Sequence, residues 1–204
     1  MLIMTSDKSK GKNIVDAFDV VYKTYENLQK LITYLQNYES SGGKYAIVPT
    51  SIPDNFLRWK ADGKNYYGWA PHSLVLAFQN IDDAELENEW RDGPVYIAEI
   101  NLYEDDEAVI NISRFDYADM SIFPSRLPVS DHWYFYNPLY GDNDSVSINE
   151  DKNKFTCTPL SEKKSKRYRG LQKVTGFTIP LVDITSENAY EKVFGGFDQL
   201  RDEI

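Results

Sequence analysis

Apolar residues recur at alternating spacings of four and three near the start of the chain. They are Ile14, Phe18, Val21, Tyr25, Leu28, Ile32 and Leu35. This spacing puts them on one stripe of an α-helix, so we predict a helix over about 13–39. Gly42 and Gly43 follow this range. Glycine readily takes the left-handed conformation that ends helices, so the helix is expected to stop before them.

This stripe needs a surface to pack against. Val15, Tyr22, Leu31 and Tyr38 widen it beyond the two apolar positions per heptad of a coiled coil. We therefore expect the helix to pack across one face of a sheet in the same chain rather than to form a coiled-coil dimer. A monomer is the expected oligomeric state.

The strongest strand pattern lies at 95–103 and 108–115. Both stretches are rich in Val, Ile and Tyr, and an acidic stretch separates them, which predicts a β-hairpin. Alternate residues of a strand point to opposite faces. One face of the first strand is apolar, whereas the other carries Glu99 and Asn101 in mid-strand. That second face is therefore either solvated or lines a cleft.

Shorter strands are expected at 45–48, 73–79, 132–136, 155–158 and 171–184, and residues 56–60 are expected to form either a short strand or one turn of helix. A polar loop is expected at 141–153. Pro180 cannot donate a ladder hydrogen bond, which predicts an edge or a bulge in the last strand. A short C-terminal helix is expected after Thr185 or Ser186, and its apolar positions are Tyr190, Val193, Phe194, Phe197 and Leu200.

The predicted fold class is α+β, with an antiparallel sheet of about five or six strands. The long N-terminal helix packs on one face of this sheet, and the short C-terminal helix lies beside it. Residues 1–12 carry lysines among Ser, Asp and Gly, and we expect a flexible polar lead-in there. Residues 13–204 are expected to form a single domain.

The formal net charge is −10, from 32 acidic and 22 basic side chains. Such a charge opposes binding to phosphate backbones and favours a protein partner, with a basic surface as one option. The exception is a basic run made of Lys163, Lys164, Lys166, Arg167 and Arg169. We interpret this run either as a solvated loop between strands or as a contact for an acidic partner or nucleic acid.

No apolar run approaches the length of a membrane span, and the first residues do not resemble a signal peptide. The expected location is therefore cytoplasmic, with no membrane contact. Cys157 is the single cysteine, so it has no partner for an internal disulfide. We predict a structural role for it.

The motifs of nucleotide-binding and nucleophile-elbow enzymes are absent from the sequence. The two histidines and one cysteine lack zinc spacing, so neither a cofactor nor a metal is expected. One catalytic alternative uses carboxylates alone. Asp92, Glu99 and Asn101 are similar in spacing to the Asp and Glu-x-Lys of restriction-like nucleases, but Asn101 replaces the lysine. The catalytic alternative is therefore a metal-dependent hydrolase or nuclease centred on Glu99.

Two aromatic clusters provide a different kind of candidate surface. Large aromatic residues are well suited to bind proteins or sugars, although they also fill cores. The predicted partner-binding residues are Trp59, Tyr66, Tyr67, Trp69, His132, Trp133 and Tyr136. A carbohydrate-binding module that uses these aromatic clusters is a further alternative.

The stretch Ile52, Pro53, Asp54, Phe56 and Leu57 follows the amphipathic helix and precedes the hairpin with its acidic turn. In these features the chain resembles the SUKH-type immunity proteins, which neutralise bacterial toxins. From charge, aromatic content and the lack of catalytic motifs we expect a non-enzymatic, acidic interaction protein. It would bind and inhibit another macromolecule, as immunity and phage anti-defence proteins do.

Overall fold

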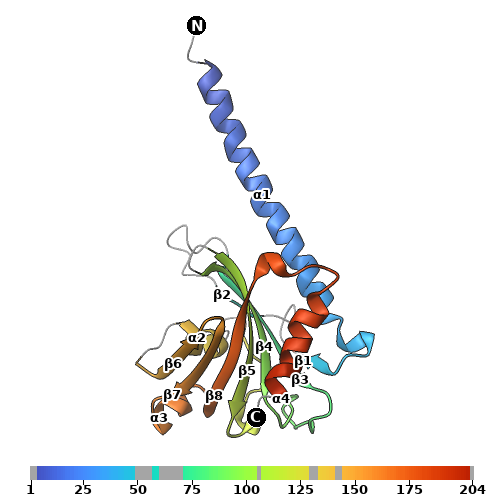
Figure 1. Cartoon of the computed structure of the whole chain (residues 1–204), viewed down its shortest axis with the longest axis vertical. Coiled ribbons are helices and arrows are strands. Elements are labelled where there is room, and N and C mark those ends of the chain that lie inside the picture. The colour runs from blue at the N-terminus through green and yellow to red at the C-terminus, as the bar shows by residue number, and fades with distance from the viewer. Residues whose placement is uncertain are drawn as a thin grey trace. The chain divides into compact units, whose positions relative to one another are not determined.

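The computed structural model describes residues 4–48, 57–59, 71–104, 107–128, 133–140 and 144–202. The chain divides into two compact units, Met1–Asn37 and Tyr38–Ile204, which we describe separately. The first unit contains the helix α1 (Met4–Gln36). The second contains the sheet and the other helices (Figure 1).

Helix α1 confirms the helical interpretation of the apolar stripe and extends it. It begins at Met4, so residues 4–12, predicted as a polar lead-in, are helical. Its polar side carries the ion pairs Lys12–Asp16 (2.6 Å) and Lys30–Glu26 (2.7 Å) at helical i,i+4 spacing. Gly42, at φ 85°, closes the short 3₁₀ helix η1 (Glu39–Ser41) that follows. The packing of α1 across the sheet stays a prediction.

The second unit is built on one antiparallel sheet, which confirms the α+β class. Seven strands follow one another in the order β1-β3-β4-β5-β8-β7-β6, slightly more than the predicted five or six. Their bounds are β1 (Tyr45–Ile47), β3 (Ser73–Asn80), β4 (Val95–Glu104), β5 (Glu107–Tyr117), β6 (Val146–Asp151), β7 (Lys154–Pro159) and β8 (Leu171–Pro180). The short β2 (Leu57–Trp59) pairs with the start of β3, while β1 pairs with the end of β3.

Strands β4 and β5 form the predicted hairpin. Two other expectations were wrong. Residues 133–136 of the aromatic stretch predicted as a strand belong to the helix α2 (Trp133–Tyr140), whose Phe135 and Pro138 are buried at helical spacing, and residue 132 lies outside the described residues. The stretch predicted as a polar loop at 141–153 contains β6, which pairs with β7 around a turn at Lys152. Pro180 ends β8 and precedes the 3₁₀ helix η6 (Leu181–Asp183).

The C-terminal helix covers one face of the sheet. It consists of a π-helical turn, η7 (Glu191–Gly195), followed by α4 (Gly196–Asp202), and Figure 1 shows α4 in red against the strands. The Phe197 ring lies 5.2 Å from the ring of Tyr96 on β4. A Cβ on Gly196 would lie 2.9 Å from the end of the Phe177 ring, so glycine permits this close approach.

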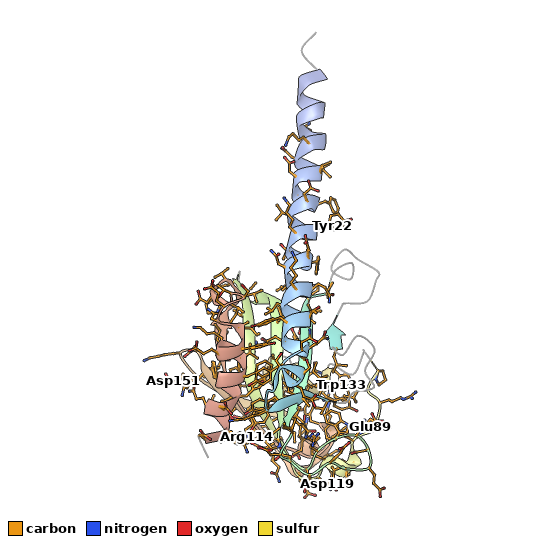
Figure 2. The ribbon with its side chains drawn as sticks, turned by 90° about the vertical axis from the view of Figure 1, so that its right-hand side faces the viewer. Tyr22, Glu89, Arg114, Asp119, Trp133 and Asp151 are labelled. Atoms are coloured by element: carbon orange, nitrogen blue, oxygen red, sulfur yellow. The ribbon has the colours of Figure 1, made fainter. Side chains whose placement is uncertain are left out.

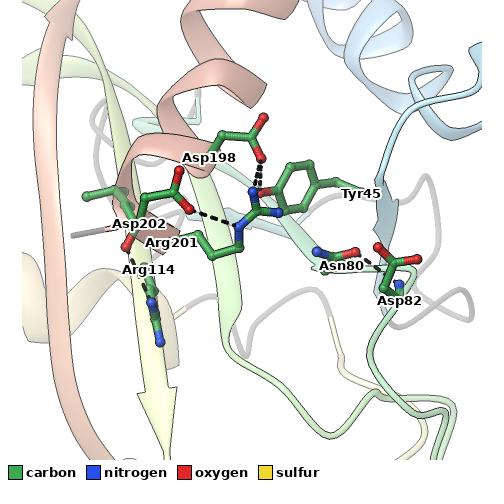
Figure 3. Close-up of polar contacts among 8 residues, drawn as sticks. Tyr45, Asn80, Asp82, Arg114, Asp198, Arg201 and Asp202 are labelled. Atoms are coloured by element: carbon green, nitrogen blue, oxygen red, sulfur yellow. Dashed lines mark hydrogen bonds and ion pairs between the residues drawn. The ribbon is translucent and has the colours of Figure 1, made fainter. Parts of the chain in front are cut away.

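Polar contacts fasten the same helix to the sheet (Figure 3). The hydroxyl of Tyr45 donates to Asp198 Oδ1 at 3.0 Å, and Arg201 pairs with Asp198 at 3.3 Å. Arg114 of β5 donates to the carbonyl of Leu200 at 3.3 Å. Burial raises the pKa of Tyr45 well above its ordinary value, so its hydroxyl keeps the proton that it donates.

A second core lies on the other face of the sheet. Its buried residues include Val75, Ile97, Phe115 and Val174 from the strands, which are covered by Phe135 of α2. The Phe115 and Phe135 rings meet edge to face, with 5.6 Å between their centroids. Short helices complete this unit: η4 (Met120–Ile122) precedes α2, and α3 (Glu162–Arg167) connects β7 to β8.

Candidate functional site

A row of polar side chains crosses the sheet on the α2 face. Glu99 of β4 stands opposite Asn111 of β5, and Asn111 stands opposite Thr178 of β8. Glu99 is fully buried and Asn111 is 1% exposed. Alternate residues of a strand share a face, so Glu99 lies on the same face as Ile97 of the core. This face is apolar at Ile97 and polar at the level of Glu99 and Asn111. We call Ser73, Glu99, Asn111 and Thr178 the polar row.

Hydrogen bonds connect the whole polar row. Ser73 Oγ donates to Glu99 Oε1 at 2.6 Å, and Asn111 Nδ2 donates to Glu99 Oε2 at 3.0 Å. Thr178 Oγ1 donates to Asn111 Oδ1 at 2.7 Å, and Asn111 Nδ2 also contacts the hydroxyl of Tyr140 on α2. Both oxygens of Glu99 therefore act as acceptors, which fixes the orientation of the Asn111 amide.

The polar row ends at a cavity of about 390 Å³. Strands β5 to β8 and the end of α2 form its wall, and Asn111, Tyr140 and Thr178 give its polar part. The apolar part consists of Val109, Leu139, Ile148, Phe155, Cys157 and Pro180. Glu107, Glu150, Lys152 and Lys154 stand around it, and all four are exposed. A cavity of this size with a few fixed polar groups is typical of a small-ligand site.

Cys157 lines this cavity but is an inert thiol. It is fully buried, and burial, with a smaller contribution from the Glu150 charge, raises the pKa of the Cys157 thiol to about 12. The thiolate is the reactive form, and at about pH 8 only about one thiol in 10,000 would be ionised. The structural role predicted for this cysteine agrees with its place in the core.

Cys157 is therefore expected to resist alkylation while the protein is folded. We expect iodoacetamide to modify the native protein at least about 100-fold more slowly than the urea-unfolded protein, because only the unfolded chain offers an exposed thiol of ordinary pKa. Intact mass spectrometry over time gives both rates. Equal rates would show that the thiol is accessible in the native state.

The residues of the nuclease alternative are not brought together. Asp92 is exposed and lines a second cavity of about 640 Å³ with Arg114 and Lys173. Glu99 lies in β4, which begins at Val95, so about 13 Å of strand separates it from the start of β4, and Asp92 precedes the strand. Asn101 is buried within β4, two residues from Glu99 and on the same face of the strand. Among the residues that the structure describes, no three His, Cys, Asp or Glu side chains are grouped to hold a metal ion.

The predicted aromatic surface lies largely outside the described residues. This applies to Tyr66, Tyr67, Trp69 and His132, and for Trp59 only the backbone in β2 is described. Trp133, labelled in Figure 2, is half-buried, stacks on Tyr134 with 3.9 Å between ring centroids, and packs against the core. Tyr136 stacks on Tyr140 at 4.6 Å. Trp133 and Tyr136 thus belong to the packing of α2.

The basic run forms α3 and the turn after it, not a loop without regular structure. Ser161 caps α3 by accepting from the backbone N–H of Lys164, whose own ammonium donates to Ser145 at 3.2 Å. Lys166 pairs with Glu162 at 2.7 Å. Arg169 lies 4.7 Å above the Tyr134 ring.

Arg167 also donates to Ser145, while Lys163 is exposed. Most cations of the run are thus engaged within the chain. The contact of this run with an acidic partner or nucleic acid stays a prediction.

Sequence patterns pointed to Glu99 but not to its partners. Asn111 and Thr178 sit in strands whose neighbouring residues are apolar or small, and nothing in the sequence pairs them with Glu99. The signal available was the polar residue in mid-strand: Asn111 lies between Ile110 and Ile112, as Glu99 lies between Ala98 and Ile100. Only the register of β4, β5 and β8 joins them.

Comparisons with known proteins give no relative from which to transfer a function. No family model, curated protein or solved structure matches the chain. The resemblance to SUKH-type immunity proteins gains no support from them, and of its residues only Leu57 lies among those described. Within the described part of the chain, no helix combines the length and apolar character required to cross a bilayer.

Proposed function

We propose that this protein is a non-enzymatic binding protein that attaches, through the exposed first part of the apolar stripe of α1 (14–22), to an apolar groove on another protein and inhibits it by occupying that groove. The observation that carries this proposal is the exposure of α1. Large apolar side chains between 45% and 69% exposed follow one another there: Ile14, Val15, Phe18, Val20, Val21 and Tyr22. Tyr22 stands out from the helix in Figure 2.

Such a run is costly to leave in water. Fully burying one large apolar side chain contributes about 1.5–3 kcal/mol. Contiguous exposed apolar residues of this size mark interaction sites. Since unit Met1–Asn37 is a single helix, it has no second element of its own to cover Ile14, Phe18 and Val21, whereas Leu28, Ile32 and Leu35 at the end of the same stripe are buried. An amphipathic helix in an apolar groove is a common mode of protein recognition.

The distribution of charge along α1 favours a groove over a second copy of the helix. With Phe18 and Tyr25 at heptad position a, the charged residues from Lys12 to Lys30 all fall at positions b and f. The flanking e and g positions are uncharged: Val15, Ala17, Tyr22, Thr24, Gln29 and Leu31. Two-stranded coiled coils commonly use charged e and g positions to choose a partner. The wide uncharged flanks of α1 instead fit a groove with apolar walls.

The net charge adds a preference for the surroundings of that groove. At −10, the chain is attracted at long range to a positively charged protein surface. We therefore propose a partner with basic residues around an apolar groove. Inhibition follows from occupancy, because a protein that acts by binding alone changes its partner by covering a surface that the partner uses.

Phe18→Glu is expected to abolish the complex. A buried, unpaired carboxylate in an apolar groove should weaken binding at least about 100-fold. The tagged wild type, Phe18→Glu and Asn27→Glu are isolated from the native host, and proteins that copurify in equimolar amounts are quantified. Asn27 is exposed and lies opposite Phe18 on the helix, so its variant adds the same charge outside the stripe.

The partner should be lost only with Phe18→Glu. Equal recovery with both variants would refute the proposed surface. Recovery of the protein as a complex of two identical copies would refute the proposed occupant.

A further inference from the structure

The cavity at the end of the polar row carries an inference that is independent of α1. We propose that it binds a neutral polyhydroxylated ligand of the size of a mono- or disaccharide. A hydroxyl group of the ligand donates to Thr178, which Asn111 holds in place, and an apolar face of its ring packs against Phe155 and Pro180.

At the polar end of the cavity, the Thr178 hydroxyl is held in a fixed direction as an acceptor. Glu99 holds the Asn111 Nδ2 group at 3.0 Å, so the Asn111 carbonyl oxygen must point the other way, toward Thr178. Thr178 uses its hydroxyl hydrogen on that oxygen at 2.7 Å. The lone pairs of the Thr178 hydroxyl are then left as acceptors beside the cavity. Acceptors select a ligand that donates, as a sugar hydroxyl does.

This orientation is built into the sheet. Asn111 is 1% exposed and Glu99 and Ser73 are fully buried, so the groups that set the direction of the amide cannot turn toward solvent. Preorganised polar groups of this kind reduce the cost of ordering on binding. Glu99, with Ser73 and Asn111 as its two donors, lies beneath the residues that line the cavity. A packed core does not require this arrangement, since apolar residues would fill the same positions.

The walls and the rim restrict the chemistry further. Phe155 lies over Gly176, where a Cβ would collide with the ring, and it forms an apolar wall with Ile148, Leu139 and Pro180. Sugar rings carry C–H faces that pack on such surfaces. The rim holds two carboxylates, Glu107 and Glu150, and two ammonium groups, Lys152 and Lys154. Equal numbers of both signs favour a ligand without net charge.

The volume sets the size of the ligand. Small-molecule sites enclose about 300–1,000 Å³, and the cavity encloses about 390 Å³. A ligand much larger than a disaccharide would extend past the exposed rim. The site is therefore suited to a free sugar or to the end of a glycan, which share the same hydroxyl chemistry.

The test is saturation-transfer difference NMR of the full chain with D-glucose, D-galactose, D-mannose, N-acetyl-D-glucosamine, lactose and maltose, and with glucose 6-phosphate as the charged comparison. At least one neutral sugar is expected to bind. Thr178→Val should lower the affinity for that sugar at least about 10-fold, because valine keeps the shape of the side chain but removes the hydroxyl that accepts. Thr175→Val is the matched control on the same strand, outside the cavity, and should bind within about 2-fold of wild type.

Amide shift mapping on the wild-type protein locates the ligand even if Thr178→Val does not fold. The shifts should concentrate at residues 109, 111, 155 and 178. Three results would overturn the proposal: no neutral sugar binds, glucose 6-phosphate binds best, or the shifts lie outside the cavity. A survey of glycan-terminated carriers then distinguishes a free sugar from the end of a glycan.

Discussion

Gly176→Ala is expected to lower the free energy of unfolding of the sheet unit by about 3 kcal/mol, because overpacking a buried site forces atoms to move. Gly176 lies in the middle of β8, opposite Ser113 on one side and Phe155 on the other. A Cβ at this position would lie 2.6 Å from the backbone carbonyl oxygen of Ile112 and would collide with the Phe155 ring. The carbonyl belongs to β5 and cannot move without disturbing the ladder.

Urea denaturation followed by circular dichroism measures this loss. Gly195→Ala is the matched control, because its Cβ would meet nothing within 4 Å. In a helix, alanine is favoured over glycine by up to about 1 kcal/mol, so the control should keep or gain stability. If the two variants unfold at the same urea concentration, the close approach of Phe155 to β8 is not required for stability.

Asn111→Asp is expected to cost about 3–5 kcal/mol of unfolding free energy at neutral pH, because it breaks a buried hydrogen-bonded arrangement and adds an uncompensated charge. The substitution replaces the amide that donates to Glu99 at 3.0 Å with a second carboxyl group. Glu99 and residue 111 are directly opposed across β4 and β5, and both are buried.

The loss should depend on pH in one direction. In the unfolded chain the new Asp ionises near pH 4, whereas in the fold its charge is disfavoured by burial and by Glu99. The difference from wild type therefore grows as the pH rises above about 4, and should be larger at about pH 8 than at about pH 5. Asn149→Asp on the exposed side of β6 adds the same charge as a control. Equal losses for the two variants, or a pH-independent loss, would contradict the role of the polar row.

Much of the architecture could be predicted from local patterns. The stripe from Ile14 to Leu35 predicted α1, because the helical period is visible in one stretch of sequence. The β4–β5 hairpin was equally visible, because two strands rich in Val, Ile and Tyr flank an acidic turn. The N-terminal bound was missed: the polar stretch 4–12 carries no apolar period, yet it continues the helix.

Two stretches were assigned wrongly because their composition was ambiguous. Trp133, Tyr134, Phe135 and Tyr136 have high strand propensity, but a short apolar run shows no period that separates strand from helix. In the folded chain, the helical conformation is stabilised by the contacts of Phe135 with the core. In β6, Asn149, Glu150 and Asp151 resemble loop residues, and pairing with β7 overrides their low strand propensity.

The candidate site was predictable only in part. Glu99 was recognised as a polar residue on a strand face, but its partners Ser73 and Asn111 come from strands 26 and 12 residues away, and Thr178, the partner of Asn111, is 79 residues from Glu99. Strand register is a property of the whole sheet, and no local pattern encodes it. The nuclease alternative relied on proximity in sequence, but Asp92 is exposed before β4 begins, whereas Glu99 is buried within it.

The central claim is that the stripe of α1 lies in a groove of another protein. The most direct measurement places a photoreactive amino acid singly at Phe18, Val21, Asp16 and Lys23 and illuminates cells of the native host. Phe18 and Val21 lie on the stripe, whereas Asp16 and Lys23 lie on the charged side. We expect one covalent adduct, with the same heterologous protein, at the two stripe positions only. Adducts at all four positions, or adducts of two 23.6 kDa chains, would contradict the central claim.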